Sequence, residues 1–390
     1  MPVAPDFCEK KNKKKLSRTI QITISERCNL NCVYCYEHEK DLTHLDVEKI
    51  KSIINESFRD SEEYSSIEFD FHGGEIALFF ETIRETCEWL WKQPIKKSYI
   101  CFASTNGTLI HGEMQKWFEK NRERFKLGVS LDGTRGMHNL NRSDSFDKID
   151  LDFFLKNYPE QPCKMTVSKE TLPHITEGIR FLHEKGFRVN ANLAYGLDWT
   201  KDLLGVYREQ LTELADFYLQ NPDLNLVNLL AVPVWSVGVN AMHPEKLERR
   251  KWCGTGDPMI CYSPEGKKYP CQAFLPSTGI KDGDKLFQDV DFEDFSLFQD
   301  PKCDQCPFLP ACPACYAHNY MATQNFGLRP IGLCNFRKVE ALAASYLQGK
   351  MLLDYKKYSF TRDMKGYQLA GIAKGVRIIQ QKFSDEVEHF

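Results

Sequence analysis

Residues 18–37 read RTIQITISERCNLNCVYCYE and join an expected strand to a cluster of thiols. Polar and apolar residues alternate through 18–25, which is typical of a β-strand with one buried face. The loop that follows carries Cys28, Cys32 and Cys35 within eight positions, with no fourth cysteine beside them. Thiolates gathered in this way favour a soft or borderline metal, and zinc and iron–sulfur clusters are the usual occupants.

Composition places the chain among ordinary globular proteins. Its 390 residues are 42% hydrophobic and 27% charged, which is enough for a large core and more than one domain. The net charge of −3 argues against a broad nucleic-acid surface. No apolar run approaches the roughly 18 residues of a membrane-spanning helix, and the amino terminus lacks a signal-peptide pattern. We therefore expect a cytoplasmic protein with no nucleic-acid or membrane partner, and a basic, flexible tail over residues 1–17.

Strand and helix patterns alternate six times between residues 18 and 235. Strands are expected at 18–25, 65–72, 98–104, 125–133, 163–168 and 187–196. Helices are expected at 43–58, 77–92, 111–122, 172–186 and 203–221. This alternation predicts an α/β fold in which a parallel sheet is connected by helical crossovers. Six units are fewer than the eight of a closed barrel, so we expect a partial (β/α)6 TIM-like barrel with a lateral opening for a large substrate.

The informative loops fall at the carboxyl ends of the expected strands, where the chemistry of such barrels lies. The cysteine loop follows the first strand. HGGEIAL (72–78), STNGTL (104–109) and SLDGTRGMHNLNR (130–142) follow the second, third and fourth strands. Each loop alone is weak evidence, because glycine pairs and Asn-Gly are common turns. Four such loops on one rim predict a functional site.

Fifteen cysteines are too many for a chain that uses thiols only as small hydrophobes in a reducing compartment. A second group follows the expected barrel and comprises Cys253, Cys261, Cys271, Cys303, Cys306, Cys312, Cys315 and Cys334. Four others stand alone and are expected to be buried hydrophobes or a tail thiol: Cys8, Cys87, Cys101 and Cys163. The eight thiols of the second group divide into two tetrads, whose spacing alone fits two zinc sites as well as two clusters.

The group of three cysteines points to a different kind of centre. Three ligands leave a tetrahedral zinc site incomplete, whereas a four-iron cluster can use three thiolates and keep one iron open. Cys28-x3-Cys32-x2-Cys35, with Tyr34 before the last cysteine, resembles the radical S-adenosylmethionine (SAM) signature. The resemblance implies that the open iron binds the amino and carboxylate groups of SAM, and that Tyr34 lies near the adenine.

The rim loops resemble the same family over the whole expected barrel. Gly73, Gly74 and Glu75 match the segment that contacts the amino group of SAM. Ser130 and Arg142 match positions that hold the ribose and the carboxylate. The resemblance therefore implies one SAM site built from these loops and the cysteine loop.

The second cysteine group resembles the SPASM extension that follows such barrels and carries two auxiliary 4Fe-4S clusters. The element Gly266-x4-Cys271 fits this extension too. The resemblance implies that the first auxiliary cluster is held by Cys253, Cys261, Cys271 and Cys315. It implies that the second is held by Cys303, Cys306, Cys312 and Cys334, so that the segments cross. With the cluster on the three-cysteine loop this makes three 4Fe-4S clusters, and neither auxiliary cluster is expected to have an open iron.

Three positions depart from the patterns of the resembled families. Ile76 stands where proline usually follows the Gly-Gly-Glu segment, and Asn139 follows His138 where aspartate is usual. Gln272 follows the third ligand of the first auxiliary cluster, where sulfatase-maturing enzymes have an aspartate as the proposed base. This last difference lowers the expectation of sulfatase maturation.

The family resemblance implies an oxidoreductase that starts radical chemistry. Ferredoxin or flavodoxin would supply an electron, SAM would be cleaved to a 5'-deoxyadenosyl radical, and that radical would abstract hydrogen from the substrate. Our first hypothesis is a maturase of ribosomally made peptides (RiPPs) that forms a carbon–carbon crosslink, as in a cyclophane, or a thioether. The alternatives are formylglycine formation in sulfatases, peptide epimerisation with Cys163 as hydrogen donor, and a non-catalytic iron–sulfur or zinc scaffold for electron transfer.

No catalytic base can be chosen from the sequence. Tyr195 and Asn192 belong to the sixth expected strand, and alternation places them on opposite faces, so at most one of them points into the barrel. An ordinary packing role is expected for each. The catalytic residues are therefore left unassigned.

The expected organisation is a barrel over 18–235, a SPASM domain over 236–340 and a helical segment over 341–390. A first strand near residue 18 leaves no room before it for a leader-binding domain. Recognition of a precursor peptide would then fall to a separate leader-binding protein, to the barrel and SPASM surfaces, or to the helical segment after Cys334.

Overall fold

The structure is a computed structural model that describes residues 15–244 and 251–387. Cys8 and most of the expected basic tail lie outside the described residues. No helix within the described ranges is long and apolar enough to cross a membrane.

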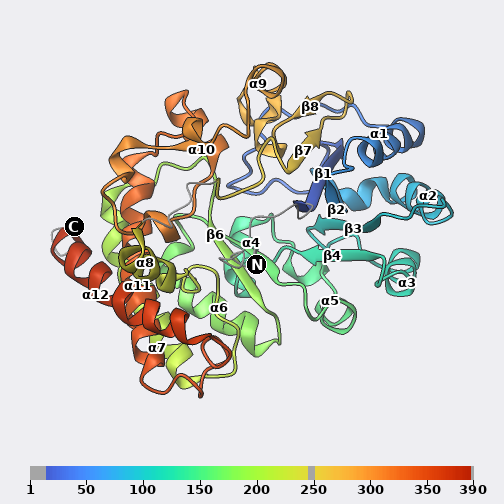
Figure 1. Ribbon diagram of the computed structural model, residues 1–390. Coiled ribbons are helices and arrows are strands. Elements are labelled where there is room, and N and C mark those ends of the chain that lie inside the picture. The colour runs from blue at the N-terminus through green and yellow to red at the C-terminus, as the bar shows by residue number, and fades with distance from the viewer. Residues whose placement is uncertain (1–14, 245–250, 388–390) are drawn as a thin grey trace.

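Six parallel strands form the open barrel that the alternation predicts (Figure 1). They are β1 (Lys15–Ser25), β2 (Tyr64–Gly73), β3 (Ser98–Thr105), β4 (Phe125–Val129), β5 (Cys163–Val167) and β6 (Val189–Leu193). The first four pair in chain order, and β5 pairs with β6. The two groups meet where the backbone N–H of Leu131 donates to the carbonyl of Lys164 at 2.9 Å. The partial α/β barrel is thus confirmed.

Helices cover the outer face of the strands where apolar residues recur with helical spacing. The crossover helices are α1 (Val47–Arg59), α2 (Phe80–Leu90), α3 (Glu113–Lys120), α6 (Ile175–Glu184) and α7 (Leu204–Gln220). In α1 the apolar stripe Ile50, Ile53 and Ile54 is buried, and the side chain of Asp46 caps the first turn by accepting from the N–H of Lys49 at 2.8 Å. These helices lie where the sequence predicts them, within a few residues.

The sequence patterns do not predict the two short helices between β4 and β5. The expected strand over 125–133 ends at Val129, and the residues after it enter α4 (Arg135–Asn141) and then α5 (Leu151–Asn157). Gly133 has a φ of +85°, which glycine adopts freely and which ends the extended run. The loop that carries the SAM-type residues is therefore partly helical.

The cysteine-rich region continues the barrel sheet. Strand β7 (Met259–Tyr262) pairs in parallel with β1, on the side opposite β2, and β8 (Lys268–Tyr269) pairs antiparallel with β7. The sheet order is β4-β3-β2-β1-β7-β8, so β1 is internal. The register sets Cys261 beside Gln21, which places one auxiliary thiol at the barrel wall.

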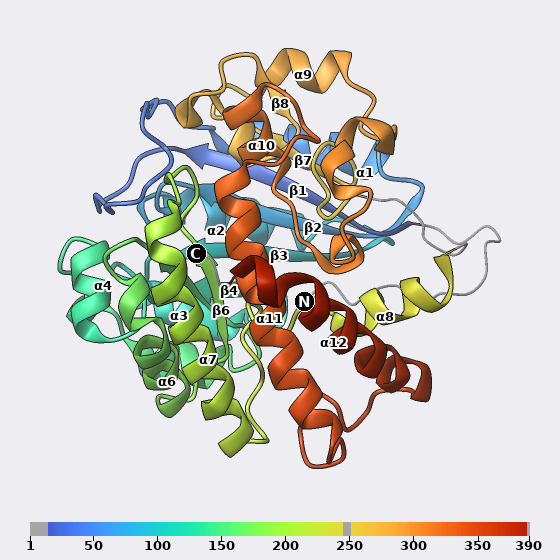
Figure 2. The same ribbon diagram turned by 90° about the vertical axis from the view of Figure 1, so that its left-hand side faces the viewer.

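Five further α-helices follow the barrel in the described residues. They are α8 (Val234–Met242), α9 (Gly283–Asp289), α10 (Tyr316–Thr323), α11 (Ile331–Leu352) and α12 (Gly366–Val387). In Figure 2, α8, α11 and α12 lie together in front of the barrel strands, and α9 lies above them beside β8. The boundaries expected at 235 and 340 fall inside α8 and α11. Helix α11 packs on α7, and α12 packs on both α8 and α11, so the carboxyl-terminal segment is tied to the barrel.

The contact between α8 and α12 depends on glycine. A Cβ added to Gly238 would lie 1.9 Å from the carbonyl oxygen of Gly371, and one added to Gly375 would lie 2.3 Å from that of Val234. The two helices therefore meet backbone against backbone, and no side chain fits between them.

We expect Gly238→Ala to lower the free energy of unfolding of the metal-free protein by about 1–3 kcal/mol, because the added methyl forces α8 and α12 apart. Gly205→Ala is the matched control, since Gly205 lies in α7 with no atom within 4 Å of an added Cβ. The control should be neutral or slightly stabilising. Urea denaturation measures both variants, and equal effects would contradict the close helix contact.

Candidate functional site

The three-cysteine loop leaves β1 at the carboxyl end of the barrel. The N–H of Cys35 donates to the carbonyl of Cys32 at 3.0 Å, which closes a turn between the two thiols. Each thiol lies within electrostatic range of the others. Burial raises the pKa of Cys32 to about 11, although Arg142 opposes this shift. The loop thus keeps Cys28, Cys32 and Cys35 within electrostatic range of one another, with Arg142 beside Cys32.

Gly73 and Gly74 hold the next rim loop against the end of β1. The N–H of Gly74 donates to the carbonyl of Ser25 at 3.0 Å, and that of Glu75 donates to Arg27 at 2.9 Å. A Cβ on Gly73 would lie 2.2 Å from the Ser25 carbonyl oxygen, and one on Gly74 would lie 2.4 Å from that of Arg27. Only glycine allows this approach, which places the Gly-Gly-Glu segment beside the cysteine loop.

Glu75 ties the loops after β2 and β3 together. Its buried carboxylate accepts from the hydroxyl of Thr105 at 2.6 Å, from the N–H of Asn106 at 2.7 Å and from the N–H of Ala77 at 3.0 Å. Burial raises the pKa of Glu75, while these bonds and Arg142 oppose the rise. The carboxylate therefore has a structural role in the rim, and its expected contact with SAM remains a prediction.

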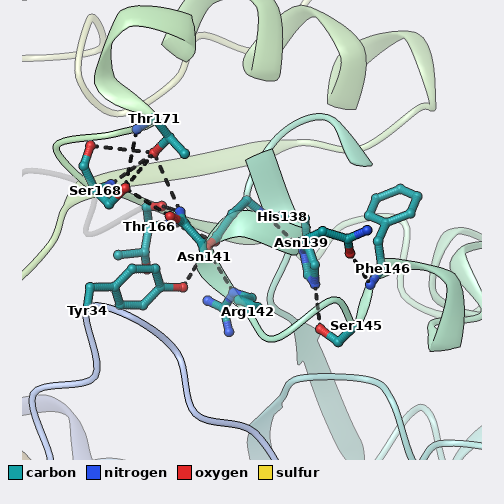
Figure 3. Close-up of polar contacts among 11 residues, drawn as sticks. Tyr34, His138, Asn139, Asn141, Arg142, Ser145, Phe146, Thr166, Ser168 and Thr171 are labelled. Carbon is teal, nitrogen blue, oxygen red and sulfur yellow. Dashed lines mark hydrogen bonds and ion pairs between the residues drawn. The ribbon is translucent and has the colours of Figure 1, made fainter. Parts of the chain in front are cut away.

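Asp132 is the hub of the rim loop after β4, and three of its partners, Tyr34, Asn141 and Arg142, are labelled in Figure 3. This fully buried carboxylate accepts from the hydroxyl of Tyr34 at 2.5 Å, from the N–H of Thr166 at 2.9 Å and from Asn141 at 3.2 Å. It also forms an ion pair with Arg142 at 3.0 Å. Asp132 is not among the site residues predicted from the sequence, because a single acid within SLDGTRG shows no pattern of its own.

Arg142 lies over the ring of Tyr34, with the guanidinium carbon 5.4 Å from the ring centroid. Burial opposes the charge of Arg142, but Asp132 and Tyr34 raise its pKa above the usual range. The arginine therefore stays cationic within range of Cys32 and Glu75. The structure brings together Tyr34, Glu75, Arg142 and the cysteine loop.

Ser130 directly follows β4 and stands two residues before Asp132. Its N–H donates to the carbonyl of Thr105 at 3.0 Å, and its backbone bridges to Lys164 of β5. It therefore lies on the rim at the junction of β4 and β5, where the resemblance expects a residue near the ribose.

His138 and Asn139 support this loop from behind. The N–H of Asp132 donates to Nδ1 of His138 at 3.3 Å, and Nε2 lies 3.0 Å from the hydroxyl of Ser145. Burial lowers the pKa of His138 to about 4, so the ring is neutral. The side chain of Asn139 accepts from the N–H of Phe146 at 2.9 Å (Figure 3). At the position where the family has aspartate, the asparagine thus holds a turn.

The second cysteine group falls into two sets in space. In the first set Cys271 is within electrostatic range of Cys253 and Cys315, and Cys261 is within range of Cys271. Cys253 precedes β7, Cys261 lies in β7, Cys271 follows β8, and Cys315 directly precedes α10. The chain therefore crosses between distant segments to bring them together.

In the second set, Cys312 is within electrostatic range of Cys306 and Cys334. Cys303 is within electrostatic range of the same two thiols. Three of these thiols lie in the loops between residues 301 and 312, and Cys334 lies in the first turn of α11. The two sets have the same membership as the crossed tetrads that the resemblance implies.

Within the described residues, no three Cys, His, Asp or Glu side chains converge on a point that suits a single metal ion. Ligands of a four-iron cluster need not converge in this way, because each thiolate binds a different iron. The all-thiolate donor sets fit iron–sulfur clusters.

The isolated candidates have ordinary surroundings. Cys163 begins β5 and is fully buried, and burial raises its pKa. Asn192 is exposed and donates to Asn190 at 3.3 Å. Tyr195 lies past the end of β6, where its ring makes an edge contact with Tyr36. None of these contacts identifies a base.

The polar face of β2 carries ionisable side chains that were not predicted as site residues from the sequence. Glu68, Asp70 and His72 alternate with buried apolar residues along β2. They lie on the same face of the sheet as Gln21 and Thr23 of the neighbouring strand β1. Gln21 donates to Asp70 at 3.3 Å and accepts from the N–H of Gln272 at 3.1 Å. Strict alternation is also what a solvated strand face shows, so it gave no signal of a site.

Glu37 extends this polar face at the barrel mouth. Its side chain is buried, and its carboxylate oxygen Oε1 lies 3.9 Å from Nε2 of His72. Burial raises the pKa of Glu37 to about 7 and lowers that of His72. The mouth of the barrel thus holds ionisable groups on the side that faces the first cysteine tetrad.

No protein-family model matches the chain. A cysteine-type anaerobic sulfatase-maturating enzyme from Clostridium novyi (strain NT) is 25% identical over 339 residues, which are 77% of this chain and 87% of that enzyme. One from Clostridium perfringens (strain 13 / Type A) is 30% identical over 184 residues, 42% of this chain and 48% of that enzyme.

Solved structures share the fold. The structure of anSMEcpe with bound AdoMet, which is SAM, has a TM-score of 0.68 at 20% identity and covers 92% of this chain and 98% of its own. Streptococcus suis SuiB bound to its precursor peptide SuiA has a TM-score of 0.54 at 17% identity, with 80% and 74% covered.

Fold, rim loops and cysteine pattern together define a radical SAM protein with a SPASM-type region. By sequence the chain is similar to the anaerobic sulfatase-maturating enzymes, and SuiB shares its fold.

Asp132→Asn should lower the free energy of unfolding of the metal-free protein by about 3–5 kcal/mol, because it leaves the buried charge of Arg142 unpaired. Asp147→Asn is the matched control, since Asp147 pairs with Arg135 on the surface, where both side chains are more than half exposed. The control should change stability little. An Asp132 variant as stable as the control would show that the carboxylate is no hub.

His138 should make the protein less stable in acid. Its pKa is lowered from 6.5 to about 4 in the folded state, so its contribution is present above pH 6.5 and is lost as the pH falls toward 4. The full loss is about 3 kcal/mol. His138→Gln should flatten the stability profile of the metal-free protein over this interval, whereas His174→Gln, at an exposed position, should not. Identical profiles would refute the role of burial.

Proposed function

We propose that this protein is a radical SAM/SPASM peptide maturase that forms a side-chain crosslink, either carbon–carbon or thioether, in a ribosomally made peptide. The observation that supports it most is the meeting of the three-cysteine loop, Tyr34, Glu75 and Arg142 at one end of an open barrel. A 4Fe-4S cluster with bound SAM would supply a 5'-deoxyadenosyl radical for hydrogen abstraction at this point.

The chain's own residues would bind and orient the cofactor. Cys28, Cys32 and Cys35 would ligate three irons, and the turn between Cys32 and Cys35 fixes their spacing. Arg142, held cationic by Asp132, would bind the carboxylate of SAM. Tyr34, whose hydroxyl is also held by Asp132, would lie against the adenine. One buried carboxylate would thus position two contacts to SAM.

Gly73, Gly74 and Ser130 would complete the site. The two glycines bring their backbone beside the cysteine loop, where it would contact the amino group of SAM. Ser130, on the neighbouring part of the rim, would contact the ribose. These roles rest on the family resemblance and on the position of each residue on the rim.

Two further 4Fe-4S clusters would occupy the two cysteine tetrads. Each tetrad supplies four thiolates, so neither cluster would have an open iron. The first tetrad adjoins the barrel through Cys261, whose sulfur lies 3.4 Å from the hydroxyl of Thr23. An electron released when the substrate is oxidised would have a nearby acceptor there.

The substrate assignment rests on relatives that handle peptides. SuiB is known with a bound precursor peptide, and anSMEcpe with the peptide Cp18Cys. A ferredoxin or flavodoxin would supply the electron, and a separate protein would bind the leader of the precursor. A barrel of six units lacks the two that would close it, and the resulting lateral opening would admit an extended peptide.

Formylglycine formation is the second candidate, because sulfatase-maturating enzymes are relatives by sequence. Gln272 argues against it, because an amide cannot act as the base that the resemblance assigns to aspartate at this position. Epimerisation with Cys163 as donor has no support, because this thiol is fully buried in the hydrophobic core at the start of β5. Crosslinking therefore remains the proposal.

Anaerobically reconstituted protein should form 5'-deoxyadenosine from SAM under dithionite, measured by chromatography. Cys32→Ala should reduce the product to background, because the cluster loses one of its three ligands. Cys87→Ala, which removes a buried thiol of the core far along the sequence from either tetrad, should retain it. Wild-type protein that forms none would refute the radical chemistry.

Co-expression with short peptides encoded beside the gene, followed by mass spectrometry, separates the candidate reactions. Crosslinking removes two hydrogens, about 2 Da, per event. Formylglycine formation from cysteine replaces the thiol by an aldehyde, and epimerisation leaves the mass unchanged but incorporates deuterium from deuterated solvent. A peptide that gains either of the latter signatures would contradict the crosslinking proposal.

A further inference from the structure

Arg329 donates a hydrogen bond to a cysteine of the second tetrad. Its Nη1 lies 2.7 Å from the sulfur of Cys312. Its backbone N–H donates to the buried carboxylate of Asp300 at 2.9 Å, which fixes the chain at this point. The guanidinium therefore reaches the tetrad from an anchored backbone.

Cations surround the second tetrad. Arg329 is within electrostatic range of Cys303, Cys312 and Cys334. Arg337 also acts on Cys312, and Lys338 acts on Cys334. The facing anion is Asp300, which opposes them at Cys303 and Cys334.

The first tetrad has a different electrostatic environment. Cys261 has two carboxylates within electrostatic range, those of Asp70 and Glu37, and shares a hydrogen bond with the uncharged hydroxyl of Thr23. The cations near this tetrad are Lys251 at Cys253 and Arg337 at Cys315. No arginine is seen to donate to a sulfur of this tetrad in the described part of the chain.

Reduction of a cluster adds one negative charge, so nearby cations and hydrogen bonds to its sulfurs stabilise the reduced form and raise its reduction potential. We propose that Arg329 holds the cluster of the second tetrad at a higher potential than that of the first tetrad. Arg329 is thus a positioning residue for electron flow, because it acts on the cluster and touches no substrate.

The consequence is a direction for electron transfer, which rests on the proposed function. The first tetrad adjoins the barrel through β7, and the second lies against the carboxyl-terminal helices. One electron accepted by the first cluster would pass to the second, which is reduced as the first is reoxidised, with no bond or proton transfer. The higher reduction potential of the second cluster would favour electron transfer away from the barrel.

The test is a redox titration followed by electron paramagnetic resonance. The protein carries Cys28→Ala, Cys32→Ala and Cys35→Ala, which leave only the auxiliary clusters. Arg329→Gln is compared with Arg329→Lys, which keeps the charge, and with Lys302→Gln, which removes an exposed cation next to Cys303 in sequence. Iron and sulfide analysis of each variant comes first, and two clusters require about eight irons per chain.

We expect Arg329→Gln to lower the midpoint potential of the higher-potential signal alone by about 59 mV, a tenfold change in a one-electron equilibrium. Arg329→Lys should lower it less, and Lys302→Gln should leave it unchanged. Full iron content with no shift, or with a shift in the lower-potential signal, would overturn the inference and leave the proposed function intact. Protein without auxiliary clusters would instead contradict the proposed function.

Discussion

The pairing of β1 with a strand on each of its sides is the constraint on which the whole arrangement depends. On one side β2 aligns in parallel, and its glycine pair closes against the carbonyls at the end of β1. On the other side β7 brings Cys261 beside Gln21. The three-cysteine loop leaves β1 at the carboxyl end of these strands. One internal strand therefore sets the position of the proposed SAM site relative to the first auxiliary tetrad.

A second constraint acts inside the rim. Asp132 is buried and accepts hydrogen bonds from the cysteine loop, from α4 and from β5. It also forms an ion pair with the arginine that follows α4. A buried carboxylate with so many donors has one stable arrangement, because each lost contact exposes a charge to an apolar environment. The side chains proposed to bind SAM are thus oriented before any ligand arrives.

Much of the barrel could be predicted from the sequence, because its strands and helices bury one face and show it as periodicity. The strand over 18–25 and the helix over 43–58 are examples. The pairing of β7 with β1 could not be predicted, since four residues show no period and the partner lies more than two hundred residues away. Local motifs gave the site cysteines, whereas Asp132 and Glu37 depend on contacts across loops that only the folded chain brings together.

The central claim is that the three-cysteine loop holds a cluster with one open iron that binds SAM. Electron paramagnetic resonance of the reduced wild-type protein, recorded with and without SAM, tests it most directly. The account predicts that SAM changes one cluster signal, that this signal is absent from the variant lacking Cys28, Cys32 and Cys35, and that the remaining signals do not respond. If no signal changes on addition of SAM, or if the responding signal persists in that variant, the account is wrong.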